Sequence, residues 1–213
     1  MKLFIESASL EAVEDAADIG ACDGVIVGAE ASRQGPKGLK KLVEALIALE
    51  VGPIVVAVSS GEAEAMITTA RALGGLGEEV VAALPLDRDG LSAAAVCFDE
   101  GIATAVGPCA NAAQALLAAK AGATWVVCDL ARVEVHGADG LKLAEDLVSM
   151  LSAGDFETQL LVTGARNAHH VGELALFGAH AAALTPERLW GLLGAADVAR
   201  ATPRPAPRST KRR

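Results

Sequence analysis

The sequence contains no tyrosine, only 3% aromatic residues and four cysteines. Aromatic scarcity means that small aliphatic side chains must build the core, and 52% of the residues are hydrophobic. The cysteines form no Cys-x-x-Cys pair, which argues against a structural zinc site or a disulfide framework. Cys109 and Cys128 are expected to be buried, unreactive thiols. A reduced, cytoplasmic protein is therefore expected.

Long apolar runs and nucleotide-binding motifs are missing as well. No apolar run reaches ~18 residues, so no membrane span is expected. The first six residues include Lys2 and Glu6 and lack the apolar core of a signal peptide. No Gly-x-Gly-x-x-Gly motif follows a strand pattern, and Gly-Lys-Ser/Thr does not occur, which disfavours dinucleotide and P-loop sites. No cofactor is predicted.

The charge distribution separates an acidic body from a basic tail. The net charge is −9, yet the last thirteen residues carry five basic side chains, three prolines and no acid. Residues 199–213 are predicted to be disordered. An acidic body argues against nucleic acid as a partner. The tail is either a solubilising end or a docking segment, residues 201–213, for a protein partner.

A short apolar run followed by an amphipathic segment recurs along residues 1–198. Expected strands are 3–6, 23–28, 53–58, 80–86, 103–107, 124–129, 159–164 and 179–184. Expected helices are 9–19, 36–49, 61–73, 89–99, 111–121, 139–152, 167–176 and 186–193. Continuous apolar runs are typical of parallel strands covered by helices. The pattern predicts an α/β protein, a single (β/α)8 TIM barrel, with an open doubly wound sheet as the alternative.

Four segments carry a family resemblance. Residues 1–25, MKLFIESASLEAVEDAADIGACDGV, resemble a motif M-K-F-F-L-D-T-A followed by a helix and D-G-V. Residues 100–126 are similar to E-G-I followed by S-A-x-Q-A-L-L-A-A-x-A-G-A-x-Y-V. Residues 130–143 resemble V-G-R-x-D then D-G, and residues 164–189 resemble S-x-R, H-V and A-x-A-G-A-x-x-x-T-x-P. The chain thus resembles the transaldolase family, in particular its small subclass that includes fructose-6-phosphate aldolase.

The resemblance implies that the catalytic positions are altered. The family's V-K-I/V-P strand aligns with residues 82–85, so its Schiff-base lysine falls at Ala83, and its first-strand aspartate falls at Glu6. Other family positions are replaced as well. Polar family residues fall at Ile26, Gly28, Ala57, Gly107, Asn111 and Gly164, and an aromatic one falls at Asp129. Two family arginines, which hold the sugar phosphate there, are matched by Arg132 and Arg166.

The chemistry of the family requires a primary amine that loses its proton near neutral pH. None of the seven lysines is expected to replace the missing one, because they precede the first strand, lie in helical patterns or fall in the tail. Covalent aldolase or transaldolase chemistry is therefore not expected.

The remaining polar residues permit several functions. A small phosphorylated or carboxylated molecule is a candidate ligand, and the residues expected to bind it are Arg132, Arg166 and Asn111. Guanidinium groups bind such anions bidentately. Alternatively the two arginines pair with Asp129 and Glu134 and only close the barrel. Glu6 and Asp129 are candidate acid–base groups, which could share a proton or hold Mg²⁺, although no metal site is predicted.

Three hypotheses follow. In the first, the chain is a pseudoenzyme that binds a small phosphorylated ligand or a protein partner. In the second, it is an enzyme of different, non-Schiff-base chemistry that uses Glu6 and Asp129 with Arg132 and Arg166 as anion anchors. In the third, it is an assembly or scaffold protein. A homo-oligomer is compatible with all three, although the decamer of the small subclass is not assumed.

Overall fold

The computed structural model of the chain describes residues 1–194, except the side chains of residues 32–34. The expected end of the barrel at residue 198 and the expected tail 199–213 lie outside the described residues.

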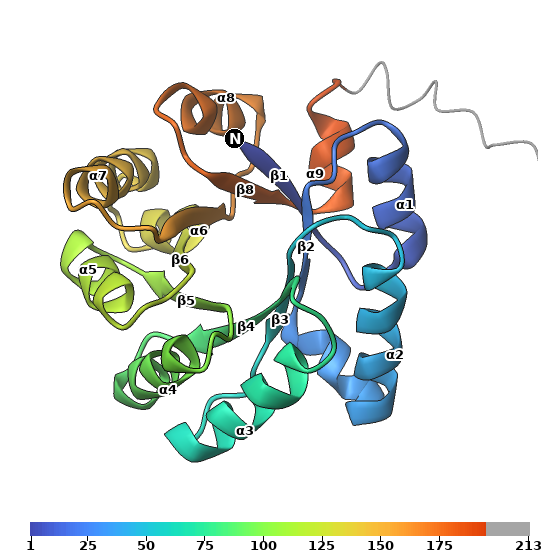
Figure 1. The fold of residues 1–213 in the computed structure, drawn as a ribbon. Helices are drawn as coiled ribbons and strands as arrows, with labels where there is room; N and C mark the ends of the chain where they lie inside the picture. Colours follow the sequence, from blue (N-terminus) through green and yellow to red (C-terminus); the bar gives the residue numbers. More distant parts are fainter. Residues whose placement is uncertain (195–213) are drawn as a thin grey trace, which may run out of the picture.

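Eight parallel strands close into a barrel in the order in which they occur in the sequence (Figure 1). The strands are β1 (Lys2–Glu6), β2 (Gly24–Val27), β3 (Ile54–Ala57), β4 (Val80–Pro85), β5 (Thr104–Cys109), β6 (Trp125–Asp129), β7 (Gln159–Thr163) and β8 (Ala181–Leu184). Because β1 pairs with β8, for example Phe4 with Ala183, the sheet has no free edge. The TIM barrel is confirmed, and the open doubly wound alternative is wrong.

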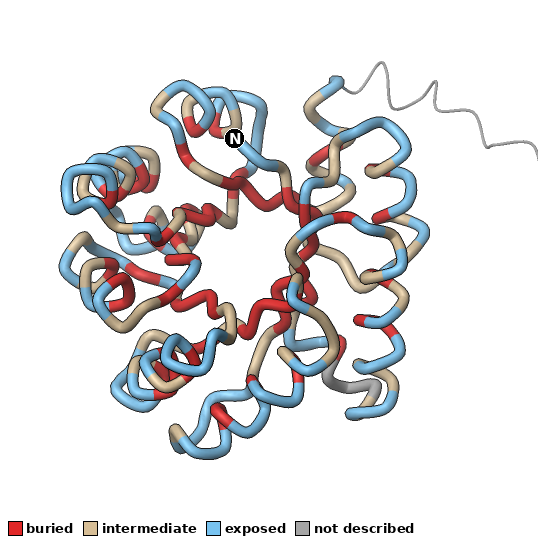
Figure 2. Tube along the Cα trace, viewed as in Figure 1, coloured by how far each residue is buried: buried red, intermediate tan, exposed pale blue. Residues whose placement is uncertain are grey.

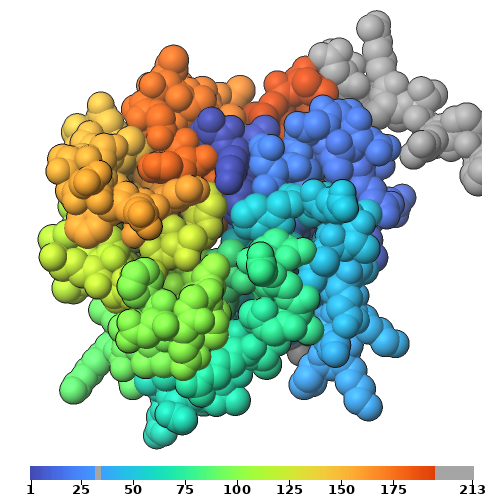
Figure 3. All heavy atoms as spheres, viewed as in Figure 1, coloured from blue at the N-terminus to red at the C-terminus, as the bar shows by residue number. Residues whose placement is uncertain are grey.

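Helices surround the strands (Figure 1). In the space-filling view, successive segments of the chain follow one another around the molecule, from blue to red (Figure 3). They are α1 (Leu10–Asp18), η1 (Ala29–Gln34), α2 (Gly35–Ile47), α3 (Ala63–Gly74), α4 (Arg88–Asp99), α5 (Ala112–Lys120), α6 (Leu130–Val135), α7 (Gly140–Ala153), α8 (Ala168–Leu176) and α9 (Pro186–Gly191). All eight expected helices are present. The 3₁₀ helix η1 and the short helix α6 were not expected, because six residues are too few to show helical periodicity.

Side-chain caps fix where several helices begin. Ser9 accepts a hydrogen bond from the Ala12 N–H at the start of α1, and Thr185 accepts one from Arg188 before Pro186 at the start of α9. Such caps satisfy backbone donors that have no partner within the helix. The capped first turns of α1 and α9 follow the carboxyl ends of β1 and β8, at the mouth of the barrel.

Two clusters of buried apolar side chains fill the molecule. Buried positions run along the strands and recur on the helices around them (Figure 2). The outer cluster lies between strands and helices and is rich in alanine. The inner cluster lies inside the barrel, where the Phe4 and Trp125 rings meet edge-on with centroids 5.4 Å apart. Gly24 makes room for this pair, because a Cβ there would come within 2.7 Å of the Phe4 ring. Large side chains thus fill the end where the strands begin and leave the opposite end open.

No helix among residues 1–194 is long and apolar enough to cross a membrane.

Candidate ligand-binding site

A cavity of about 510 Å³ opens at the carboxyl ends of the strands. Ala83 lies on its wall, and the register of β3, β4 and β5 places Ala57 and Ala105 beside it on the neighbouring strands. The polar side chains that line it are Ser59, Ser60 and Thr163, and the rest of the lining is apolar or glycine. Three neighbouring alanines therefore make a broad wall that offers no hydrogen bond.

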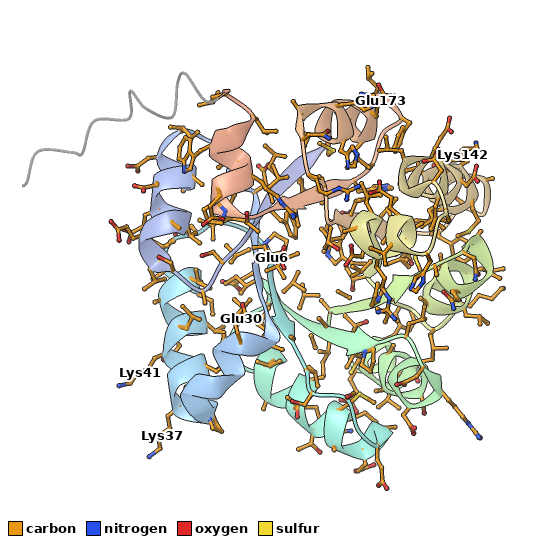
Figure 4. The ribbon with its side chains drawn as sticks, turned by 180° about the vertical axis from the view of Figure 1, so that it is seen from behind. Glu6, Glu30, Lys37, Lys41, Lys142 and Glu173 are labelled. Atoms are coloured by element: carbon orange, nitrogen blue, oxygen red, sulfur yellow. The ribbon has the colours of Figure 1, made fainter. Side chains whose placement is uncertain are left out.

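Amines lie away from this cavity. No lysine among the described residues lines it. Lys37, Lys41 and Lys142 lie on the outer ring of helices and point away from the barrel (Figure 4). Hydrogen bonds with Asp146 and Glu145 raise the pKa of Lys142 to about 12, so this amine stays protonated. Lys2 lies 5.7 Å from the centroid of the Trp125 ring, at the start of β1.

Glu6 ends β1 and reaches the mouth from inside the barrel, beside Glu30 of η1 (Figure 4). Burial raises the pKa of Glu6, the positive charge of Arg188 opposes this rise, and the negative charges of Glu30 and Asp129 add to it. The facing of Glu6 and Asp129 was expected. Glu30 and Arg188 were not expected, because they lie in η1 and α9 rather than at the carboxyl end of a strand.

At two glycines of the mouth, Gly28 and Gly164, a carboxylate lies where a Cβ would be. A Cβ at Gly28 would come within 2.4 Å of a Glu30 carboxylate oxygen, and one at Gly164 within 2.5 Å of the Asp129 Oδ1. Gly164 also has a φ of +75°, a conformation that favours glycine. A side chain at position 28 would displace the Glu30 carboxylate, and one at position 164 would meet both Asp129 and the Ala131 backbone N.

Asp129 and Arg132 meet through the backbone. The Asp129 carboxylate accepts a hydrogen bond of 3.2 Å from the Arg132 N–H and so caps α6. The exposed Arg132 side chain lines a second cavity of about 270 Å³, together with Gln114 and His136. The expected pairing of the Arg132 side chain with Asp129 is thus replaced by a backbone contact.

Arg166 forms an ion pair with Glu134 of α6, as the structural alternative proposed. The same carboxyl group lies 3.9 Å from Nε2 of His170. Burial lowers the pKa of His170, and the positive charge of Arg166 lowers it further. Glu134 therefore already neutralises one of the two arginines expected to bind an anion.

Asn111 caps α5, accepting a hydrogen bond of 3.0 Å from the Gln114 N–H. In return, the Gln114 Oε1 accepts one of 2.7 Å from the Ala110 N–H. Both side chains thus orient the β5–α5 loop beside the second cavity. Among the described residues, no group of three His, Cys, Asp or Glu side chains could hold a metal ion.

Cys109 and Cys128 are free thiols on neighbouring strands, paired in register and both buried. A hydrogen bond from Cys128 lowers the pKa of Cys109, and the same contact raises that of Cys128. Their expected burial is confirmed, whereas their lack of reactivity stays a prediction.

Comparison with known proteins shows which protein family the chain belongs to. A model of the transaldolase/fructose-6-phosphate aldolase family matches residues 29–206. The chain belongs to this family. A probable transaldolase of Anaeromyxobacter sp. (strain Fw109-5) is 38% identical over 184 residues, 86% of either chain. One of Aquifex aeolicus (strain VF5) is 36% identical over 179 residues, 84% of this chain and 82% of its own.

The structure shows where the residues that align with polar family positions lie. Four positions at which the resemblance implies polar family side chains, the lysine included, line the cavity of about 510 Å³: Ile26, Ala57, Ala83 and Gly107. At Gly107 the strands are close, because a Cβ there would lie 2.6 Å from that of Val127. The four positions therefore line one cavity and contribute no polar side chain to it.

Proposed function

We propose that this transaldolase-family barrel performs no Schiff-base chemistry and binds a small phosphorylated or carboxylated molecule at its mouth. The observation that carries the proposal is Ala83, which lies on the cavity wall between Ala57 and Ala105. A methyl group offers neither a nucleophile nor a proton carrier. The lysines placed on the outer helices cannot reach this wall.

The mouth retains cations for an anionic ligand. The Arg132 guanidinium is exposed at the second cavity, and Arg166 needs only to exchange the Glu134 carboxylate for a ligand phosphate or carboxylate. Planar guanidinium groups bind both anions through two parallel hydrogen bonds.

Isothermal titration with inorganic phosphate tests the anion site. Arg132→Met and Arg166→Met should each weaken binding about tenfold. Lys120→Met, in the last turn of α5 at the opposite end of the barrel, should change it less than about twofold. The wild-type protein should not cleave fructose 6-phosphate. Turnover of that sugar, or equal binding by all three variants, contradicts the proposal.

A second candidate function is proton transfer without a covalent intermediate. It is favoured by Glu6, whose burial raises the pKa of its carboxyl group towards the range useful for a general acid or base. Here Glu6, with Asp129 nearby, abstracts a proton next to a carbonyl while the arginines hold the anion. Solvent exchange of the α-protons of dihydroxyacetone phosphate, followed by NMR, should then disappear in Glu6→Gln. No exchange in the wild-type protein would exclude this function.

A further inference from the structure

We propose that the ligand of this mouth is an anion with an apolar body rather than a polyhydroxylated sugar phosphate. This inference rests on the proposed function, because it assigns the anionic end of the ligand to the same arginines. It adds the chemical class of the part that enters the barrel.

The cavity wall cannot satisfy a row of hydroxyl groups. Ala57, Ala83 and Ala105 are neighbours in register, and Ile26 and Val127 complete the same lining. The backbone groups of these strands bond to adjacent strands of the closed barrel. A hydroxyl placed against this wall would lose its water partners and gain none, at a cost of about tenfold in affinity each.

An apolar body gains affinity from the same wall, because it removes water from apolar surface on both sides. The volume of about 510 Å³ lies in the range typical of small-molecule sites, so an aromatic ring or short alkyl chain fits. The hydroxyl groups of Ser59, Ser60 and Thr163 remain for a single polar substituent on that body.

Charge at the mouth orients the ligand. Glu6 and Glu30 lie beside each other on the β1 and η1 side, where they repel an anion (Figure 4). The second cavity, which the exposed Arg132 lines together with Asp129, shares Pro108 with the first. An anionic group at Arg132 therefore leaves the attached body next to the alanine wall.

Titration calorimetry with phenyl phosphate, glycerol 3-phosphate and phenol tests the inference. Phenyl phosphate should bind at least about tenfold more tightly than glycerol 3-phosphate. Ala83→Gln should lower the affinity for phenyl phosphate about tenfold and leave the affinity for inorganic phosphate unchanged. The matched control is Ala72→Gln, on an exposed position of α3, and should alter neither. Circular dichroism confirms that each variant is folded.

The outcomes separate the inference from the function on which it rests. Equal affinities for phenyl phosphate and glycerol 3-phosphate, both reduced by Arg132→Met, overturn the apolar ligand and leave the anion site standing. Equal affinities for phenyl phosphate and phenol, both insensitive to Arg132→Met and Arg166→Met, overturn the anion site. Loss of phenyl phosphate binding in both Ala83→Gln and Arg132→Met supports the whole proposal.

Discussion

Glu6 is a partly buried acid at the mouth, and the charges of Arg188, Glu30 and Asp129 act on its carboxyl group. Burial contributes most to its raised pKa, followed by the opposing charge of Arg188 and the repulsion from Glu30 and Asp129. A raised pKa means that the folded protein binds this proton more tightly than the unfolded chain does. Protonation of the Glu6 carboxyl group is therefore coupled to the free energy of unfolding.

The sign of the coupling can be measured. The stabilisation due to the Glu6 proton is complete below the unfolded pKa of about 4.3 and is lost as pH rises through the higher folded pKa. Glu6→Gln should therefore gain stability relative to wild type as pH increases from about 4 to 7, as measured by urea denaturation. The pKa of Glu187 is lowered, mainly by a hydrogen bond from its own backbone N–H and one with Thr185. Glu187→Gln should show the opposite slope, and parallel slopes would contradict the assignment.

Gly164 is a second position at the mouth where adding a single atom, the Cβ of alanine, is expected to change stability. Gly164→Ala should destabilise the protein by about 1–2 kcal/mol, because φ is +75° and Asp129 Oδ1 occupies the space of a Cβ. Gly172, in the middle of α8 with no atom within 4 Å of an added Cβ, is the matched control. Gly172→Ala should stabilise by about 0.5–1 kcal/mol. Denaturant unfolding of both variants measures these changes in the free energy of unfolding. An unchanged free energy of unfolding in Gly164→Ala would contradict the proposed coupling of Gly164 and Asp129.

At the scale of elements, α5 shows how a candidate ligand residue also has a structural role. Asn111 caps the helix, and Gln114 binds back to the Ala110 N–H. Asn111→Ala should cost about 0.5–2 kcal/mol in unfolding free energy, and Asn111→Ser should restore most of it. Phosphate titration then separates the two roles: if Asn111 only caps, Asn111→Ser binds phosphate like wild type. Weaker binding by a stable Asn111→Ser variant shows a direct contact with the ligand.

The sequence predicts the regular elements better than the mouth. Continuous apolar runs and caps such as Ser9 and Thr185 are local signals, so strand order and helix starts follow from them. Glu30 and Arg188 carry no local signal, because they meet Glu6 only when the barrel closes. Helix α6 is equally hidden, since it follows its strand without a loop and Asp129 both ends β6 and caps α6.

At the scale of the whole molecule, the two ends of the barrel differ in the size of the side chains that fill them. Large side chains such as Phe4 and Trp125 close the end where the strands begin, which preserves the core. Small side chains such as Ala57 and Ala83 line the cavity at the end where the strands finish. Such a barrel can be stable without an active centre, because its packing and its mouth use different residues. Residues 195–213 stay outside this account, and the docking role of residues 201–213 stays a prediction.

Borohydride trapping tests the central claim, the absence of Schiff-base chemistry, most directly. The protein is incubated with dihydroxyacetone or fructose 6-phosphate, reduced, and analysed by intact and peptide mass spectrometry. The wild-type chain should carry no reduced adduct, whereas Ala83→Lys, which places an amine on the cavity wall, should acquire one at position 83. A stoichiometric adduct on any lysine of the wild-type protein would contradict the account.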